Sequence, residues 1–341
     1  MSDEPDRIPG TENFDIKPGF EQRYKGLCRN EEDYEEFMKY SLSFLRRSIR
    51  INTLKADIEN VKKSLSEKGW ILTQIPWCKE GFWLDNKTGR RDIGNTEEHM
   101  LGYIYVQEAV SMIPPVVLNP IPGETILDMC ASPGSKTSQI AMYMKNQGIL
   151  LANDYKGMRV RPLGINMQRI GAINILITLM DGARFKDLEF DRILVDAPCS
   201  GSGTIRKSLK TLRMWNEGSI RRIAGQQKTL LENAYKLLKP GGTIVYSTCT
   251  LEPEENEGVV SYLLNKYPDM ECVPIKIDMK LGEPILEWND EKFNPQVNNV
   301  LRIWPQDNDT EGLLVANLIK KKKFQTSNSL LYMFMNSSKF S

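Results

Sequence analysis

Hydrophobic and polar positions follow two different periods over residues 31–105. Apolar residues recur at helical spacing in 31–45 and again in 57–70, so each segment is predicted to be an amphipathic helix. Short apolar runs beside these helices predict strands at 46–54, 81–85 and 103–107. Residues 31–105 are therefore predicted to form a small α+β domain. Residues 1–30 show little periodicity and are predicted to form a loose arm.

From residue 106 onward, nearly continuous apolar strands alternate with helical segments. The predicted helices are 137–146, 161–171 and 223–242. The predicted strands are 124–130, 148–154, 174–181, 191–198, 242–249, 300–305 and 311–321. Such repetition of strand, helix and strand predicts an α/β fold with a doubly wound, mostly parallel, seven-stranded Rossmann-like sheet over 106–325. Residues 326–341 are predicted to be a tail.

Composition narrows the class of protein without naming it. The chain has 341 residues, of which 40% are hydrophobic and 26% charged, as expected for a soluble globular protein of about two domains. No apolar run reaches the length of about 20 residues that a membrane span needs. The acidic start has no apolar signal core. A cytoplasmic protein without a membrane partner is expected.

Cysteine and histidine usage excludes several chemistries. The six cysteines are scattered at 28, 78, 130, 199, 249 and 272 with no Cys-x-x-Cys pair, so no metal site is expected and the thiols are expected to be free. His99 is the only histidine and lies in a polar segment, where we expect a surface position. A Ser-His-Asp or Cys-His catalytic site would therefore need His99 as its base.

Charge is balanced overall but distributed unevenly. The formal net charge is +1, so no global field attracts a polyanion. Residues 1–40 are acidic, with eleven acidic and six basic side chains, whereas residues 201–228 carry one acidic residue, at 217, and seven basic residues, at 206, 207, 210, 213, 221, 222 and 228. The basic segment is consistent with a phosphate-binding surface and also with an ordinary solvated helix face.

The turn CASPGSKT at 130–137 joins the first strand of the predicted sheet to its first helix, where such folds bind ligands. It matches neither the P-loop pattern nor the Gly-x-Gly-x-x-Gly dinucleotide pattern. Asp154, Asp181 and Asp196 end the next three strands, where Asp154 is placed to bind ribose hydroxyls and Asp181 an adenine amino group. Each aspartate alone could be a turn former. Together they predict adenosine bound without phosphates, which suggests S-adenosylmethionine.

Cys199 and Cys249 follow the fourth and fifth predicted strands. Neighbouring strands lie about 4.8 Å apart, so both thiols are placed to reach one substrate atom. A thiolate that adds to carbon-6 of cytosine makes carbon-5 nucleophilic enough to accept a methyl group. Loss of the carbon-5 proton then expels the thiol. The two cysteines therefore suggest addition to a pyrimidine and elimination from it, with one thiol adding and the other assisting release.

The segments LDMCASPGSKT (127–137), DRILVDAPCSGSGTIRK (191–207) and STCTLEPEENE (247–257) resemble the Sun/Fmu (NSUN) family of RNA cytosine-5 methyltransferases, over roughly residues 35–320. The resemblance implies that Cys249 is the nucleophile and that Cys199 assists release. It implies that Asp196 binds the cytosine edge and that Lys136 lies beside the base or the nucleophile. It also implies a cofactor site at Cys130, Ala131, Ser132, Pro133, Gly134, Ser135, Lys136, Asp154, Arg159, Asp181 and Asp196.

Two departures from the family pattern concern sites away from the thiols. Ser135 stands where many members have glycine, and Glu311, Leu313 and Leu314 replace residues of a more usual Asp-Gly-Phe-Phe segment, which bears on RNA contacts there. The acidic run 252–257 is expected to cap the helix that follows Cys249.

The sequence thus predicts an S-adenosylmethionine-dependent methyltransferase domain at 106–325, acting as a monomer on structured RNA. Transfer RNA is expected ahead of ribosomal RNA. The 31–105 domain and the basic segment 201–228 would hold the RNA, with the target base extruded. Two other classes are weighed. A catalytically silent RNA-binding scaffold would not need both cysteines and all three aspartates, and an amino-group or protein methyltransferase would usually carry an aromatic residue where this chain has DAPC.

Overall fold

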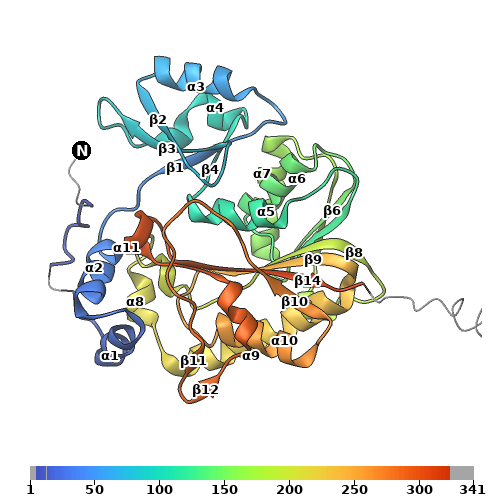
Figure 1. Cartoon of the computed structure of the whole chain (residues 1–341). Helices are drawn as coiled ribbons and strands as arrows, with labels where there is room; N and C mark the ends of the chain where they lie inside the picture. Colours follow the sequence, from blue (N-terminus) through green and yellow to red (C-terminus); the bar gives the residue numbers. More distant parts are fainter. Residues whose placement is uncertain (1–4, 13, 323–341) are drawn as a thin grey trace, which may run out of the picture.

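The computed structural model describes residues 5–12 and 14–322 (Figure 1). The predicted tail at 326–341 lies outside them. Within these residues, a large sheet flanked by helices lies below a smaller sheet, and two N-terminal helices lie beside the large sheet (Figure 1). In the same part of the chain, no helix has both the length and the apolar character needed to cross a membrane.

The central sheet confirms the predicted doubly wound, mostly parallel fold. Among the described residues it has eight strands, with the order β10-β14-β9-β8-β5-β6-β7 and with β13 paired to β14. The parallel strands are β5 (Thr125–Asp128), β6 (Ile149–Asp154), β7 (Ile175–Leu179), β8 (Phe190–Asp196) and β9 (Leu238–Thr248). The antiparallel strands are β10 (Met270–Val273), β13 (Leu301–Ile303) and β14 (Leu313–Lys320). The sequence had predicted all of these except β10.

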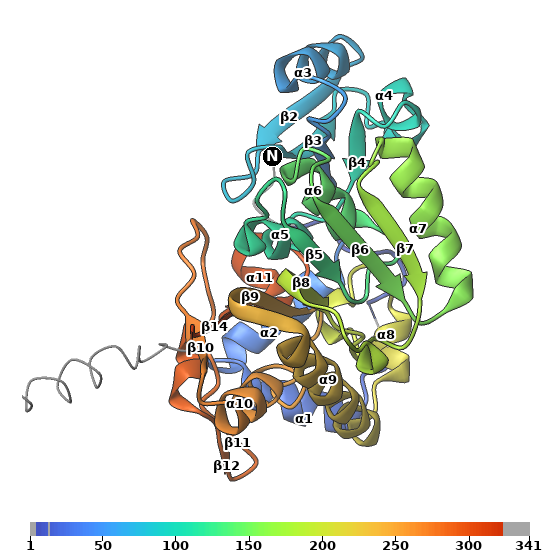
Figure 2. The same ribbon diagram turned by 90° about the vertical axis from the view of Figure 1, so that its right-hand side faces the viewer.

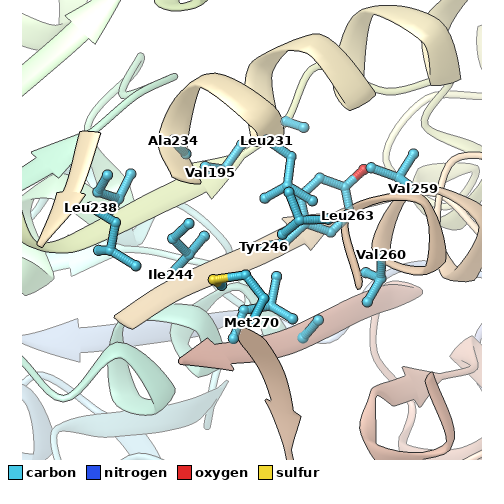
Figure 3. Packing of buried hydrophobic residues seen from close by; sticks show 14 of the residues in the cluster. Val195, Leu231, Ala234, Leu238, Ile244, Tyr246, Val259, Val260, Leu263 and Met270 are labelled. Atoms are coloured by element: carbon cyan, nitrogen blue, oxygen red, sulfur yellow. The ribbon is translucent and has the colours of Figure 1, made fainter. Parts of the chain in front are cut away.

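Helices cover both faces of this sheet (Figure 2). One side carries α5 (Ile113–Leu118), α6 (Ser135–Tyr143) and α7 (Gly157–Ile170), and the other carries α9 (Glu217–Leu237) and α10 (Glu257–Lys266). Because alternate side chains of a strand point to opposite faces, Leu194 of β8 packs with α5 and α6 whereas Val195 packs with α9 and α10. Figure 3 shows Val195 and Tyr246 among Leu231, Val259 and Leu263 of these two helices. Burial on both faces explains the nearly unbroken apolar runs.

The smaller sheet has the strand order β2-β3-β1-β4 and is antiparallel throughout. Its elements are β1 (Ser48–Ile51), α3 (Ile58–Glu67), β2 (Trp70–Gln74), β3 (Gly81–Asn86), α4 (Glu97–Met100) and β4 (Ile104–Val106). Ile49, Leu65 and Phe82 pack in its core. This is the small α+β unit that the periodicity predicted, with β2 as an additional strand.

The N-terminal region is more ordered than predicted. Two helices, α1 (Pro18–Leu27) and α2 (Glu31–Ser41), bury Phe20, Tyr24 and Phe37 against Ile205 and Leu251 of the central domain. The prediction of a loose arm was therefore wrong for residues 18–27. The helix predicted at 31–45 exists as α2, but it packs on the central domain and not on the small sheet.

The remaining elements are short. They are α8 (Lys210–Met214), α11 (Pro305–Asn308), β11 (Glu287–Trp288), β12 (Glu291–Lys292) and the 3₁₀ helices η1 (Ile93–Asn95), η2 (Val110–Met112), η3 (Gly182–Arg184), η4 (Ser202–Thr204) and η5 (Pro295–Asn299).

Candidate active site

The two thiols meet at the carboxyl edge of the central sheet. Strands β8 and β9 are parallel neighbours, with Asp196 opposite Ser247, so the loops that follow them emerge side by side. The Sγ atoms of Cys199 and Cys249 lie 3.1 Å apart, and both residues are half-buried. The expectation that neighbouring strands deliver both thiols to one point is confirmed.

Hydroxyl groups and a glycine fix the two thiol loops together. The Thr250 hydroxyl is hydrogen-bonded to the hydroxyls of Ser200 at 2.7 Å and Ser202 at 2.8 Å. The Gly203 amide donates to the Cys249 carbonyl at 3.0 Å. A Cβ at Gly203 would lie 2.9 Å from that carbonyl and 2.6 Å from the carbonyl of Gly312, so only glycine fits. The loops are therefore held in register at the sulfur pair.

The electrostatics of the site act on Cys199 and on Lys136. The hydrogen bond with Cys249, followed by burial, raises the pKa of Cys199 well above that of an ordinary thiol. A raised pKa favours the protonated form of Cys199, whose thiol is then able to donate a hydrogen bond to the Cys249 sulfur. Burial acts to lower the pKa of Lys136, but Asp196 outweighs it and the net shift is upward, with a further contribution from Cys249. A stable positive charge thus lies near the Cys249 sulfur.

Asp196 and Lys136 form one unit beside the thiols. Lys136 Nζ donates to Asp196 Oδ2 at 2.7 Å, and the Ser247 hydroxyl donates to Asp196 Oδ1 at 2.8 Å. Both oxygens of Asp196 therefore have partners within the strands and the turn. The family resemblance implied that Asp196 and Lys136 both lie at the active site, and in the structure they are in contact.

A cavity of about 280 Å³ opens beside this unit. It is lined by Met129, Cys130, Asn153, Asp154, Tyr155, Arg159, Asp181, Gly182, Ala183, Pro198, Gln226, Gln227, Thr229 and Leu230. Four of the predicted cofactor residues, Cys130, Asp154, Arg159 and Asp181, are among them. The sequence did not predict the others, and those from α9 follow no strand end that could have signalled them.

The cavity fits S-adenosylmethionine. Asp154 Oδ2 is buried with no hydrogen-bond partner among the described residues, and its nearest cation is Arg159 Nη1 at 3.5 Å. The side-chain oxygen of Gln227 is also buried without a partner in that part of the chain. An unpartnered carboxylate oxygen is suited to ribose hydroxyls, and Met129, Pro198 and Leu230 offer apolar surface to an adenine ring.

The rest of the predicted cofactor turn shapes the site without lining the cavity. Gly134 has φ +105°, and a Cβ there would lie 2.7 Å from Met167, so the turn needs glycine. Arg159 Nη2 donates to the Ser132 carbonyl at 2.7 Å, which ties the turn to α7. Of the predicted residues, Ala131, Ser132, Pro133, Gly134, Ser135, Lys136 and Asp196 are not among the lining.

His99 lies away from the thiols, in α4 of the small domain. It is half-buried, and burial together with nearby Arg169 lowers its pKa. The expected surface position therefore holds only in part. Among the described residues, no group of three His, Cys, Asp or Glu side chains is arranged to hold a metal ion.

The basic segment 201–228 is only partly a surface. Arg206 is buried, and it donates to the carbonyls of Phe44 at 2.6 Å and Thr310 at 3.2 Å and pairs with Asp309 at 2.7 Å. It is a structural residue. The exposed members are Lys207, Lys210, Arg213, Arg221 and Arg222.

The acidic run after Cys249 does more than cap a helix. Glu252 is fully buried and accepts hydrogen bonds from Arg23 at 2.6 Å, Tyr24 at 2.8 Å and Trp215 at 2.9 Å. Glu257 pairs with buried Arg302 at 2.8 Å. Only Glu257 lies in the first turn of α10. The expectation of a capping role for the whole run was therefore wrong, because most of its carboxylates bind side chains distant in sequence.

A doubly wound sheet with a nucleoside-sized cavity and a thiol pair at its carboxyl edge defines the class of S-adenosylmethionine-dependent methyltransferases that act on a pyrimidine. Comparison with known proteins gives the family. The chain belongs to the family described as 16S rRNA methyltransferase RsmB/F, whose model matches residues 115–319. The model described as the N-terminal domain of 16S rRNA methyltransferase RsmF matches residues 16–109. The chain is therefore an S-adenosylmethionine-dependent RNA methyltransferase.

Individual relatives agree with this membership. The chain is 47% identical over 304 residues to the tRNA (cytosine(49)-C(5))-methyltransferase of Pyrococcus abyssi, covering 88% of this chain and 95% of that protein. It is 41% identical over 293 residues to the ribosomal RNA small subunit methyltransferase F of Shewanella oneidensis, covering 84% of this chain and 60% of that protein.

Solved structures share the fold. A methyltransferase homolog from Pyrococcus horikoshii has a TM-score of 0.78 at 38% identity, covering 88% of this chain and 94% of that chain. NSun6 from Pyrococcus horikoshii, solved with SFG, has a TM-score of 0.78 at 24% identity, covering 90% and 99%.

Proposed function

We propose that this protein methylates carbon-5 of cytosine in transfer RNA, with Cys249 as the nucleophile and Cys199 as the residue that assists release. The observation that carries the proposal is the thiol pair, whose sulfur atoms lie 3.1 Å apart, with Cys199 directly following Pro198 of the cavity lining. A single thiol in this position would more often be a small buried residue.

The tRNA assignment rests on identity, which is 47% to the tRNA enzyme of Pyrococcus abyssi and 41% to the ribosomal enzyme of Shewanella oneidensis. This chain spans 95% of the Pyrococcus abyssi tRNA enzyme. It spans less than two thirds of the ribosomal relatives, 60% of one and 57% of another. Ribosomal RNA is the alternative substrate, and it is supported by the family descriptions.

The residues act in a defined order under this proposal. The Cys249 thiolate adds to carbon-6, and the negative charge that develops on the ring is stabilised by the Lys136 ammonium group, which Asp196 holds in place. When bound, S-adenosylmethionine supplies the electrophilic methyl group that carbon-5 accepts.

Release regenerates the starting thiols. The carbon-5 proton leaves to water, its electron pair re-forms the double bond between carbon-5 and carbon-6, and the carbon–sulfur bond breaks. The Cys199 thiol donates a hydrogen bond to the departing Cys249 thiolate across 3.1 Å, which makes that sulfur a better leaving group. No proton is gained or lost by the thiol pair over the cycle.

Two cysteine variants test the assignment. With tRNA and labelled S-adenosylmethionine, the native protein should form 5-methylcytidine, and Cys249→Ala should abolish it. Cys199→Ala should instead accumulate an RNA adduct that survives a denaturing gel. Cys272→Ala, in the core of the sheet, is the matched control and should keep activity. Exchanged phenotypes of the two variants would contradict the assignment, and methylation of ribosomal RNA alone would favour the alternative substrate.

We further propose that the enzyme acts as a monomer in the cytoplasm. Light scattering of the purified protein at micromolar concentration tests the first point, since a dimer would have twice the 39.0 kDa mass of the chain.

A further inference from the structure

A small cluster of one aromatic and two basic side chains is formed by the segment between α2 and β1 and the segment that follows β3. Phe44 follows α2 and is 40% exposed, although it is a large apolar residue. The guanidinium carbon of Arg91 lies 4.8 Å from the centre of its ring. Arg47 is exposed three residues further along the chain. An exposed ring with a cation on one face is the arrangement on which nucleic-acid bases commonly stack.

The two arginines of the cluster have no carboxylate partner among the described residues. Burial, together with the charge of Arg91, lowers the pKa of Arg47, whereas Asp92 opposes this shift only in part. Asp92 is already paired with Arg90. Arg91 therefore lies close enough to Arg47 to repel it, and the acid nearest to both is already held by Arg90. An anion between them would relieve the repulsion.

The cluster is fixed relative to the thiols. Buried Arg206 donates to the Phe44 carbonyl at 2.6 Å and to the Ser43 hydroxyl at 3.2 Å, and it follows Cys199 by seven residues. The same arginine donates to the carbonyl of Thr310, two residues before Gly312. The Gly312 amide in turn donates to the carbonyl of Gly203, whose amide binds the Cys249 carbonyl. Phe44 is thus connected to the nucleophile by a short series of direct contacts.

Additional positive charge continues the cluster toward the site. Lys207 is exposed directly after Arg206, and neither it nor Arg47 or Arg91 forms an ion pair within the described chain. Arg46 lies beside Arg47, with its guanidinium carbon 4.4 Å from the centre of the Trp83 ring. Positive side chains on neighbouring segments are suited to neutralising successive phosphates of an RNA strand.

We propose that Phe44, Arg47 and Arg91 form a nucleotide subsite that holds RNA next to the target cytosine. The Phe44 ring stacks on a flanking base by the face not occupied by Arg91, and the two guanidinium groups bind the adjoining phosphate. The inference rests on the proposed function for the nature of the ligand, and it adds a defined place where the strand enters the site.

The test measures RNA affinity without any chemistry. An unmodified tRNA transcript is bound to the native protein and to Arg47→Ala/Arg91→Ala in filter-binding titrations from about 50 to 200 mM salt. Each phosphate contact contributes about 0.7 to 0.9 to the slope of log affinity against log salt. We expect the double variant to bind at least tenfold more weakly. The slope should fall by at least the amount that one phosphate contact contributes. Phe44→Ala should weaken binding at every salt concentration without changing the slope, and Phe44→Trp should restore it.

The matched control is Lys63→Ala/Lys87→Ala, which removes two exposed positive charges from the same small domain, on α3 and after β3. This control variant should bind the tRNA transcript with an affinity within about twofold of that of the native protein. Thermal melting separates binding from folding, because removal of the facing arginines should leave the melting temperature unchanged or raise it. Equal affinities and slopes for the native protein and Arg47→Ala/Arg91→Ala would overturn the inference, as would an equal loss in the lysine control.

The proposed function and the subsite can fail separately. If the native protein bound tRNA through these residues but made no 5-methylcytidine in any RNA, the reaction would be wrong and the subsite would stand. If it made 5-methylcytidine while the double variant retained full affinity, the reaction would stand and the subsite would be wrong.

Discussion

At the scale of single residues, a carboxylate that lies behind Cys199 contributes to the raised pKa of this thiol. Glu255 is fully buried, and its Oε2 accepts hydrogen bonds from the Ser200 amide and from Gln227, each at 2.9 Å. Its negative charge contributes to the raised pKa of Cys199. Glu255 therefore acts on the thiol pair through position and charge, and we interpret it as a positioning residue.

Glu255→Gln should make Cys199 more acidic, because it removes the nearby negative charge and keeps an oxygen that can accept from Ser200. We expect iodoacetamide to alkylate Cys199 several-fold faster at pH 8 in this variant, as measured for each cysteine by mass spectrometry. Cys130 serves as the internal reference, since its pKa is raised first by burial and then by Asp128. An unchanged rate at Cys199 would show that Glu255 only supports the loop.

A second buried carboxyl links stability to pH. Burial raises the pKa of Asp128, at the end of β5, to about 7 even though the Thr137 hydroxyl donates to it at 2.7 Å. An unfolded aspartate titrates near 4, so the folded protein binds more protons between about pH 4 and pH 7. The stability that protonated Asp128 contributes is therefore present at low pH and is lost as the pH rises through 7.

Asp128→Asn should remove this dependence, because asparagine stays neutral and can still accept from Thr137. The melting temperature of the variant relative to the native protein should therefore rise between pH 5 and pH 8. A shift of one pKa unit corresponds to about 1.4 kcal/mol, so the effect should be measurable by thermal melting. A constant difference between the two proteins over this range would contradict the assigned pKa.

At the scale of secondary-structure elements, the sequence predicted what is strongly periodic and missed what depends on distant partners. Strands β8 and β9 are buried on both faces and appear as apolar runs. Strand β2 is buried mainly at Trp70, and β10 has only four residues, so neither run is distinctive. Helix α1 was missed because its ten residues bury few apolar side chains, and these contact residues far away in the chain.

The acidic run shows the same limit. Spacing alone indicated a helix cap, but Glu252 binds Arg23, Tyr24 and Trp215, which lie far from it in the sequence. No local pattern signals such a partner. Through these contacts α1 is hydrogen-bonded to Glu252, three residues after Cys249. The N-terminal helix therefore helps to hold the loop that carries the proposed nucleophile.

Glu252→Ala should therefore destabilise the protein strongly, because it leaves the Tyr24 and Trp215 donors without their buried acceptor and leaves Arg23 with Glu254 in place of two carboxylates. Loss of one partner of a buried pair costs about 3–5 kcal/mol, which should lower the midpoint of urea unfolding. The control lies on α1, the helix that carries Arg23 and Tyr24: Glu21→Ala removes an exposed pair with Lys25 at 3.1 Å and should cost less than about 1 kcal/mol. Similar losses in both variants would show that the buried network contributes little.

At the scale of the whole molecule, the catalytic edge was predictable and the lining of the cavity was not. Residues that end parallel strands, such as Asp154 and Asp181, can be assigned to the cofactor cavity from their place in the sequence. This is possible because parallel strands all end at the same edge of the sheet. Gln227 and Leu230 reach the cavity from α9, whereas Asp196 and Lys136 are not among its lining residues. These placements depend on how helices cross the sheet, which no local spacing encodes.

The connection between the two domains is equally hidden in the sequence. Arg50 lies in β1 of the small sheet and is completely buried, yet its guanidinium group contacts the central domain. It donates to the Ser135 carbonyl at 3.0 Å and to the Ser138 hydroxyl at 2.6 Å, both in the first turn of α6, and to Gln107 at 2.9 Å. All three acceptors are neutral, and burial lowers the pKa of this arginine. The small domain is thus hydrogen-bonded to the helix that follows the cofactor turn.

Arg50→Met tests whether this contact transmits the position of the small domain to the cofactor site. Methionine fills part of the space and removes the buried charge, so the cost in folding should be modest. The first turn of α6 loses its fixed partner, and we expect the dissociation constant for S-adenosylmethionine to rise about tenfold in isothermal titration, equivalent to about 1.4 kcal/mol. Arg50→Lys keeps the positive charge but loses the forked donors of the guanidinium group. Its dissociation constant for S-adenosylmethionine should lie between those of the native protein and Arg50→Met. A lower melting temperature with unchanged cofactor affinity would mean that Arg50 serves folding alone, because a residue that only stabilises the domain contact has no reason to alter a site it does not line.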